Sequence, residues 1–115
     1  MNCTPIVKAI AREAGQVSLQ LDLPADLPCF QGHFPGFPVL PGVIQLDWVM
    51  RLAVEHLRCG QLSATDFRIK FKQVVGPGSP LTLTLTHDAP RQRLDFTYHI
   101  GDLVASQGRV MLDAP

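Results

Sequence analysis

The side chains best suited to chemistry in this 115-residue sequence are His33 and Asp47, which stand fourteen positions apart. His33 lies in a segment, residues 31–42, in which three prolines fix φ and three glycines permit conformations that other residues resist. Such a loop holds one shape, and an imidazole held in one place can be aimed at a reacting atom. A lone histidine and a lone aspartate make a weak signal in general, so the residues between them decide how much the pair means.

A helix is predicted to follow this loop from Val43, because no proline or glycine occurs before Gly60, which stands where a helix C-cap is expected. Apolar residues occupy most of its circumference, which is typical of a buried central helix. Asp47 lies at the edge of a narrow polar strip in the first turns of this helix. One interpretation makes it a half-buried functional carboxyl group. The other pairs it with Arg51 at i,i+4 on a wetted face, an interaction of about 0.3–0.5 kcal/mol.

Length and composition indicate a single domain, residues 1–115, with enough apolar residues for a core. The hydrophobic content is 46% and the formal net charge is zero, which does not suggest a protein that binds nucleic acid or a membrane surface. The N-terminus lacks the long apolar run of a signal peptide, and no stretch approaches the roughly 20 apolar residues of a membrane span. We therefore expect a soluble, cytoplasmic protein.

The three cysteines, Cys3, Cys29 and Cys59, are odd in number, far apart and without metal-ligand spacing. We expect them to be reduced and to serve in packing. The remaining histidines, at positions 56, 87 and 99, have no partner at a recognisable spacing. They are interpreted as surface or strand-face residues.

Six short runs with β-strand character surround the predicted helix, two before it and four after it. Several of them alternate apolar and polar residues, as half-buried antiparallel strands do. One helix inserted after the second strand predicts an α+β domain, in which an antiparallel sheet packs one face on the helix and exposes the other to water. The predicted strands are 6–12, 17–23, 67–72, 81–86, 94–100 and 103–112.

The loop and the start of the helix closely resemble the signature of the 3-hydroxyacyl-[acyl-carrier-protein] dehydratases. The matching residues are Gly32-His33-Phe34-Pro35-Gly36-x-Pro38-x-x-Pro41-Gly42-Val43-x-x-x-Asp47. The resemblance is sharp over about residues 31–50 and only topological elsewhere, and it implies a hotdog fold, a long central helix wrapped by an antiparallel sheet. Widespread family members with this loop carry Glu where this chain has Asp47. In having Asp at this position, the chain resembles the dehydratase/isomerase branch of the family. The short chain looks most like the small dehydratases of aryl polyene synthesis.

The resemblance implies a hydro-lyase that removes water from a 3-hydroxyacyl thioester to give the trans-2-enoyl thioester, in a fatty-acid-like or aryl polyene pathway. His33 would be the base for the C2 proton and Asp47 the acid for the C3 hydroxyl, which requires burial to keep Asp47 protonated. The free backbone N–H groups of Gly42 and Val43, at a helix N-terminus, would polarise the thioester carbonyl. No metal or organic cofactor is required.

The partner implied by the resemblance is an acyl carrier protein that carries the substrate. The exposed cations Arg68, Lys70 and Lys72 on one predicted strand are best interpreted as aids to solubility, but they leave docking of an acidic carrier open. In the family two subunits pair and each site takes its histidine and its acid from different chains. We therefore expect a homodimer, or a heterodimer with a related dehydratase subunit.

Aromatic residues near the predicted site, Phe34, Phe37 and Trp48, are expected to line the acyl tunnel or the dimer contact, with plain core packing equally open for Trp48. Two other functions remain as alternatives. A hotdog acyl thioesterase would use the same fold and a similar acyl site. A non-catalytic partner subunit is also possible in this family, although it would have no need of both His33 and Asp47.

Overall fold

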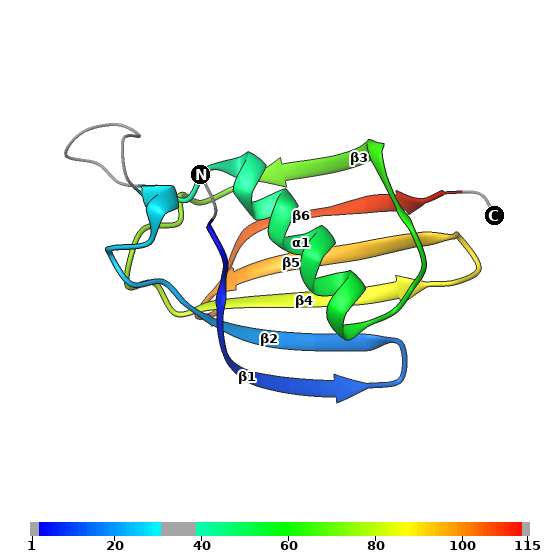
Figure 1. Cartoon of the computed structure of the whole chain (residues 1–115), viewed down its shortest axis with the longest axis horizontal. Coiled ribbons are helices and arrows are strands. Elements are labelled where there is room, and N and C mark those ends of the chain that lie inside the picture. The colour runs from blue at the N-terminus through cyan, green and yellow to red at the C-terminus, as the bar shows by residue number, and fades with distance from the viewer. Residues whose placement is uncertain (1–2, 31–38, 114–115) are drawn as a thin grey trace.

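The computed structural model describes residues 3–30 and 39–113, which form one antiparallel sheet with a long helix lying across it (Figure 1). The predicted α+β hotdog architecture is confirmed. The elements are β1 (Ile6–Glu13), β2 (Gln16–Asp22), the 3₁₀ turn η1 (Pro28–Phe30), α1 (Gly42–His56), β3 (Leu62–Phe71), β4 (Leu81–Asp88), β5 (Arg93–Ile100) and β6 (Leu103–Leu112).

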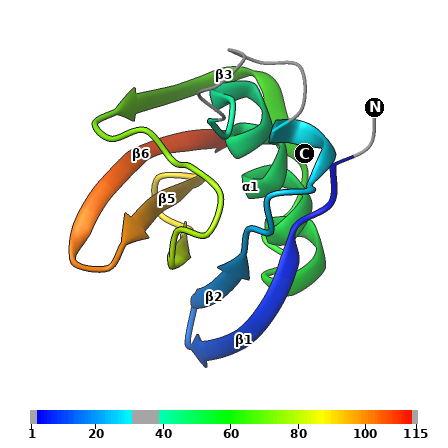
Figure 2. The same cartoon turned by 90° about the vertical axis from the view of Figure 1, so that its left-hand side faces the viewer.

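The described strands make a six-stranded sheet in the order β1-β2-β4-β5-β6-β3, with every neighbouring pair antiparallel. The chain enters the sheet at one edge, crosses it with α1, and resumes at the opposite edge with β3. Figure 2 shows that the sheet curves around the helix. This arrangement leaves β1 and β3 as the two edge strands of the described sheet.

The period-two alternation in the strands produces the two faces of the sheet. Leu81, Leu83 and Leu85 of β4 are at most 1% exposed on the helix side, while the threonines between them point outward and are partly exposed. Phe96 and Tyr98 on β5 extend the same buried layer. The prediction that one face packs on the helix and the other meets water is confirmed.

The helix ends earlier than the sequence pattern predicts. It stops at His56, and the N–H groups of Leu57 and Arg58 both donate to the Ala53 carbonyl. Arg58 takes a left-handed backbone conformation, with φ of 51°. The chain therefore leaves the helix before Gly60, and the prediction of Gly60 as the C-cap is wrong.

The expectation that α1 is buried on all sides is also wrong. Its sheet side is buried, but Val43 and Val54 on the opposite side are 73% and 61% exposed. The sheet of one chain covers only one side of a helix, so the apolar residues on the far side have no cover within the described part of this chain. The helix thus carries an unusually apolar exposed face.

Strand β3 begins at Leu62, five residues before the predicted start at Phe67. The first part is irregular, since the Ser63 hydroxyl accepts hydrogen bonds from the backbone N–H groups of Thr65 and Asp66 at 3.2 and 2.9 Å. The register with β6 shifts between Leu62 and Phe67. Regular alternation resumes only after this bulge, which explains why the sequence pattern missed the first half.

The expectation of three reduced cysteines is not met, because Cys3 and Cys29 form a disulfide with Cα atoms 5.6 Å apart. The N-terminal segment runs alongside η1, so 26 residues of sequence separation do not keep the two cysteines apart. Cys59 is free and buried, and burial raises the pKa of its thiol. Trp48 is fully buried, and its indole N–H donates to the Cys3 carbonyl at 3.1 Å. Trp48 is therefore packed in the core and has no surface to offer a second chain, and its predicted place beside the acyl tunnel stays a prediction.

Candidate active site

The N-terminus of α1 is capped by a residue that has no side-chain acceptor. Pro41 is the N-cap, with extended backbone angles, and its carbonyl accepts hydrogen bonds from the N–H groups of Ile44 and Gln45 at 3.1 and 3.0 Å. The N–H groups of Gly42 and Val43 lie in the same turn and are not used by that carbonyl. Because the first N–H groups of a helix carry its positive dipole end, this pair suits an electron-rich oxygen such as a thioester carbonyl.

The ring of Phe71, at the end of β3, lies against the backbone of Gly42. A Cβ atom on residue 42 would overlap that ring. The Phe71 side chain is itself 52% exposed, so the ring lies between the helix terminus and solvent. The absence of a side chain at Gly42 thus lets the Phe71 ring pack against the first turn of α1.

Asp47 lies one turn further along α1, with its carboxylate 2.9 Å from Nε of Arg51. The two side chains are 42% and 41% exposed, which corresponds to the ion pair predicted by the i,i+4 spacing. Burial raises the pKa of Tyr98 well above its usual range, and the charge of Asp47 adds to that rise. The carboxylate of Asp47 therefore acts electrostatically on the core beneath the helix while its own side chain stays half-exposed.

A group of buried polar residues lies directly below the first turn of α1, and the sequence pattern did not predict it. The Gln45 amide donates to the Leu40 carbonyl at 3.2 Å and accepts from the Ser106 hydroxyl at 2.8 Å. The Tyr98 hydroxyl donates to the Gln45 main-chain carbonyl at 2.6 Å. The helical spacing could have indicated that Gln45 is buried, because Gln45 shares a helix face with Trp48 and Leu52 at i, i+3 and i+7.

A cavity of about 380 Å³ opens beside this turn, between the start of α1 and the segment that follows β3. It brings together the free helix terminus, the buried Gln45 and several apolar side chains. Its size and mixed lining suit the reacting end of an acyl group with a carbonyl to be held. The lining residues are Leu40, Gly42, Gln45, Phe71, Lys72, Gln73, Val74 and Val75.

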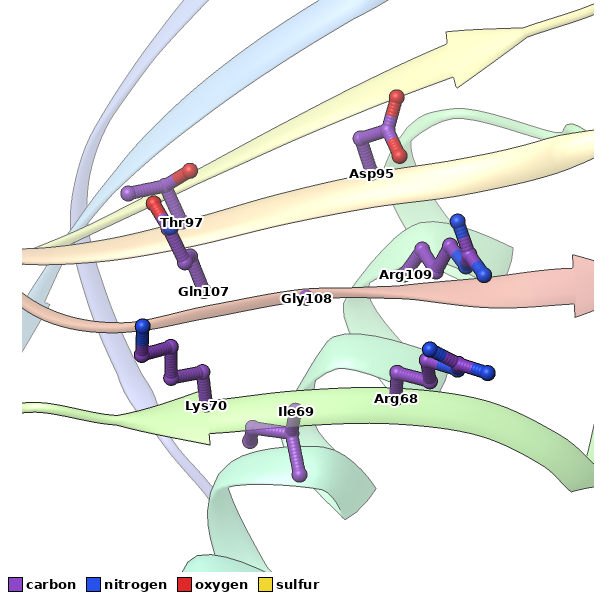
Figure 3. A pocket seen from close by; sticks show the side chains of 8 residues that line it. All are labelled: Arg68, Ile69, Lys70, Asp95, Thr97, Gln107, Gly108 and Arg109. Carbon is purple, nitrogen blue, oxygen red and sulfur yellow. The ribbon is translucent and has the colours of Figure 1, made fainter.

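A larger hollow of about 520 Å³ lies on the other face of the sheet, over β3, β5 and β6 (Figure 3). Arg68 and Arg109 stand beside each other on neighbouring strands, and Lys70 follows on the same face as Arg68. Asp95 is the acidic group of this hollow, and it pairs with Arg93 at 3.0 Å. The hollow is shallow and predominantly cationic, and the sheet separates it from the helix terminus.

The predicted residues His33, Phe34 and Phe37 lie outside the described residues, so their roles remain predictions. Of the predicted site, the structure brings Gly42, Val43 and Asp47 together on two turns of α1. Within residues 3–30 and 39–113, no group of three or more His, Cys, Asp or Glu side chains is arranged to hold a metal ion. No helix in the described part of the chain is long and apolar enough to cross a membrane.

Solved structures with the same fold include close matches over almost the whole chain. The dehydratase heterocomplex ApeI:P from Xenorhabdus doucetiae shares 36% identity, with 96% of this chain and 99% of that chain covered at a TM-score of 0.87. An uncharacterized protein from Erwinia carotovora subsp. atroseptica shares 40% identity, with 94% of each chain covered at a TM-score of 0.78.

A curated relative is the 3-hydroxyacyl-[acyl-carrier-protein] dehydratase FabZ of Syntrophomonas wolfei. It is 29% identical over an alignment of 100 residues, with 80% of this chain and 62% of that protein covered. The match therefore spans less than two thirds of the relative's length.

Fold and site together define a hotdog-fold protein whose central helix begins at a proline N-cap with no side-chain cap. A family model described as ApeI-like, ApeI dehydratase, matches residues 9–109. The chain belongs to this dehydratase family. The family resemblance predicted from residues 31–50 is thereby confirmed and extends over most of the chain.

Proposed function

We propose that this protein is a hydro-lyase that eliminates water from 3-hydroxyacyl thioesters carried by an acyl carrier protein. The observation that supports it best is the placement of Asp47 one turn from the free N–H groups of Gly42 and Val43, in a chain of the ApeI-like family. These groups match two of the three requirements of the reaction, an acid for the leaving hydroxyl and donors for the thioester oxygen. The third, a base for the C2 proton, is assigned to His33.

In the proposed reaction the imidazole of His33 removes a proton from C2, and the electron pair of that C–H bond forms the C2–C3 double bond. The C3–O bond breaks, and the departing hydroxyl takes a proton from Asp47 to leave as water. The N–H groups of Gly42 and Val43 stabilise the negative charge that develops on the thioester oxygen. The proton then passes from the imidazolium back to the carboxylate, which restores the resting enzyme.

Asp47 is the residue that links this chemistry to a second chain. A general acid must hold its proton, and burial is what keeps an aspartic acid protonated. In the single chain Asp47 is half-exposed and paired with Arg51. We infer that a second chain covers the outer face of α1, where Val43 and Val54 are exposed, and buries Asp47 as it binds.

Edge strand β3 is the element that we assign to this contact. Phe67 and Phe71 lie on the helix side of β3 yet remain 38% and 52% exposed, so an apolar strip runs from the edge strand to the helix. The sequence alone offers two other pairing edges, residues 103–105 of β6 and the loop after Pro24, and both stay predictions. Residues 103–105 lie beyond the β3–β6 ladder, which ends at Phe71 and Ser106. The partner is either a second copy or a related subunit, and the similar ApeI:P structure is a heterocomplex.

Subunit complementation tests the shared site. We expect His33→Ala and Asp47→Asn each to abolish activity, and a mixture of the two to recover part of it when subunits exchange. A mixed dimer holds one intact site if each site takes His33 from one chain and Asp47 from the other. Absence of recovery despite demonstrated exchange contradicts a composite site, as does a monomer by sedimentation at working concentration.

The cationic hollow on the outer sheet face is the surface that we assign to the carrier protein. Carrier docking predicts that Arg68→Glu and Lys70→Glu raise KM for carrier-bound substrate and leave KM for the same acyl group on pantetheine unchanged. Lys8→Glu, on the opposite edge strand, is the matched control, since it makes the same change of charge outside the hollow. Equal effects of all three variants, or an equal effect on the pantetheine substrate, contradict this docking surface.

Product mass tests the activity itself. Purified protein is incubated with 3-hydroxyacyl-carrier-protein substrates of several chain lengths, and we expect the loss of one water with the acyl group still attached and enoyl absorbance rising. Release of free carrier thiol without enoyl absorbance would identify a thioesterase. If neither product forms with any partner subunit supplied, a non-catalytic role is favoured.

A further inference from the structure

Gln45 is a buried amide that ties three separate parts of the fold to the first turn of α1. Its side chain is bonded to Leu40 and to Ser106 of β6, and its main-chain carbonyl is bonded to Tyr98 of β5. Gln45 is 3% exposed, and Ser106 and Tyr98 are fully buried. Every bond of this group is therefore formed away from solvent.

A buried amide is a costly choice for this position. Trp48 and Leu52 on the same helix face are apolar, and an apolar side chain of similar volume at position 45 would avoid the desolvation of the amide. Hydrogen bonds return little net stability once that desolvation is included. These hydrogen bonds instead fix one orientation of Gln45 and its helix turn, because any other orientation would break a bond of the buried network.

The orientation that Gln45 fixes is that of the helix terminus. Its amide holds the Leu40 carbonyl, and the Leu40 N–H is held from the other side by the Val75 carbonyl at 2.6 Å. Pro41 follows immediately and serves as the helix cap, so the directions of the Gly42 and Val43 N–H groups depend on this turn. The bond from Tyr98 restrains the helix rotation two residues before Asp47.

We propose that Gln45, held by Ser106 and Tyr98, is a positioning residue that orients both the Gly42–Val43 N–H pair and Asp47 for dehydration. The inference rests on the proposed function and deepens it. Gln45 acts through other groups and takes no part in proton transfer. Its expected signature is a lower kcat with KM little changed, since misplaced donors and a misplaced acid weaken the transition state more than the bound substrate.

Three variants remove the bonds separately while keeping the shape of the core. Gln45→Met removes both side-chain bonds, Ser106→Ala removes one, and Tyr98→Phe removes the bond to the main-chain carbonyl. Val110→Ala is the control for general loss of stability, because Val110 is fully buried on β6 and has no polar side-chain group. Ser18→Ala is the control for loss of a serine hydroxyl, since Ser18 bonds to Thr84 on the outer face of the sheet.

We expect kcat to fall about 10- to 100-fold in Gln45→Met and about 5- to 10-fold in Ser106→Ala and Tyr98→Phe, because displacements near 1 Å at a reacting centre cost up to about 10² in rate. KM should stay within about twofold in all three, and the two controls should keep the wild-type kcat. Should Gln45→Met fail to fold, Ser106→Ala and Tyr98→Phe carry the test alone. Wild-type kcat in those two variants, or an equal loss in Val110→Ala at matched thermal stability, would overturn the proposal.

Amide hydrogen exchange separates this proposal from the proposed function. The N–H groups of Ile44 and Gln45, both bonded to the Pro41 carbonyl, should exchange at least about tenfold faster in Ser106→Ala, while those of Leu57 and Arg58 at the other helix end keep the wild-type rate. If wild-type protein forms no enoyl product, the proposed function fails, and exchange still decides whether Gln45 orders the helix terminus. If wild-type protein is active but neither kcat nor exchange changes in the variants, only the positioning role fails.

Discussion

The two ends of α1 differ in the hydrogen-bond partners that the rest of the chain offers to their backbone groups. At the C-terminal end, the N–H groups of Leu57 and Arg58 share the Ala53 carbonyl, and a guanidinium N–H of Arg12 donates to the His56 carbonyl at 2.6 Å. At the N-terminal end the cap is a proline, which offers no side-chain acceptor to the free N–H groups. One end of the helix is thus closed by protein groups, whereas at the other end the described residues offer the Gly42 and Val43 N–H groups no acceptor.

This difference supports our proposal that the chemistry takes place at the N-terminal end. A helix selected only for stability gains from a polar N-cap, which typically contributes about 0.5–2 kcal/mol relative to alanine. The chain forgoes that stabilisation at the end where Gly42, Val43 and Asp47 lie, and it uses buried hydrogen bonds to orient the same turn. An uncapped terminus with a fixed orientation is what a ligand oxygen requires.

The largest effect is expected from Asp47→Asn, which should lower turnover about 10²- to 10⁴-fold, the range for loss of a proton-transfer group. Asp47→Glu should keep some activity, because it retains the acid and displaces it by one methylene. Glu55→Gln is the matched control near the closed end of the same helix, where the carboxylate is 69% exposed. Enoyl formation measures all three, and full activity in Asp47→Asn would reduce Asp47 to the surface partner of Arg51.

Gly42→Ala should lower kcat about 10-fold or more, because the new Cβ overlaps the Phe71 ring and either it or the displaced ring obstructs the N–H pair. Steady-state kinetics and thermal melting are measured together. Removing the ring as well, in Gly42→Ala/Phe71→Ala, should restore the melting temperature. The comparison variant is Gly60→Ala beyond the closed end, where φ is +103° and no atom lies within 4 Å of the new Cβ. Gly60→Ala should lose stability through backbone strain and keep its kcat. A lower kcat in Gly60→Ala, together with an unchanged kcat in Gly42→Ala, would be inconsistent with a functional helix N-terminus.

Arg12→Ala should have the smallest effect, a loss of about 0.3–1 kcal/mol in unfolding free energy with activity unchanged, because it removes a cation from the helix C-terminus. Urea denaturation at low and high salt measures this loss, which should shrink as salt screens the charge. A fall in kcat without a fall in stability would show that the closed end also takes part in catalysis.

Local patterns predicted the parts of the fold and site that depend on neighbours in the sequence. Runs with β-strand character, several of them alternating, placed five of the six strands near their observed bounds, and i,i+4 spacing predicted the Asp47–Arg51 pair. The first half of β3 was missed because the Ser63 bulge breaks the alternation. The Gly/Pro/His signature of residues 31–47 predicted the family, because so many fixed positions at one spacing rarely coincide by chance.

Contacts between distant segments could not be predicted in the same way. Gln45 meets Ser106 and Tyr98, which lie 61 and 53 positions away, and nothing in either strand pattern marks those two residues as its partners. The Cys3–Cys29 disulfide depends on where η1 places the chain. The exposed outer face of α1 was missed because its apolar residues have the pattern of a core helix, and only the position of the sheet decides which side is covered.

Chemical-shift mapping with an unreactive substrate analogue tests the open helix end most directly. A 3-hydroxyacyl-pantetheine in which an amide replaces the thioester is titrated into ¹⁵N-labelled protein with its partner subunit present. We expect the amide protons of Gly42 and Val43 to move downfield and saturate together, as donors to the analogue carbonyl, while those of Leu57 and Arg58 stay in place. Saturable binding that leaves Gly42 and Val43 unmoved would contradict the assignment of this helix terminus as the active site.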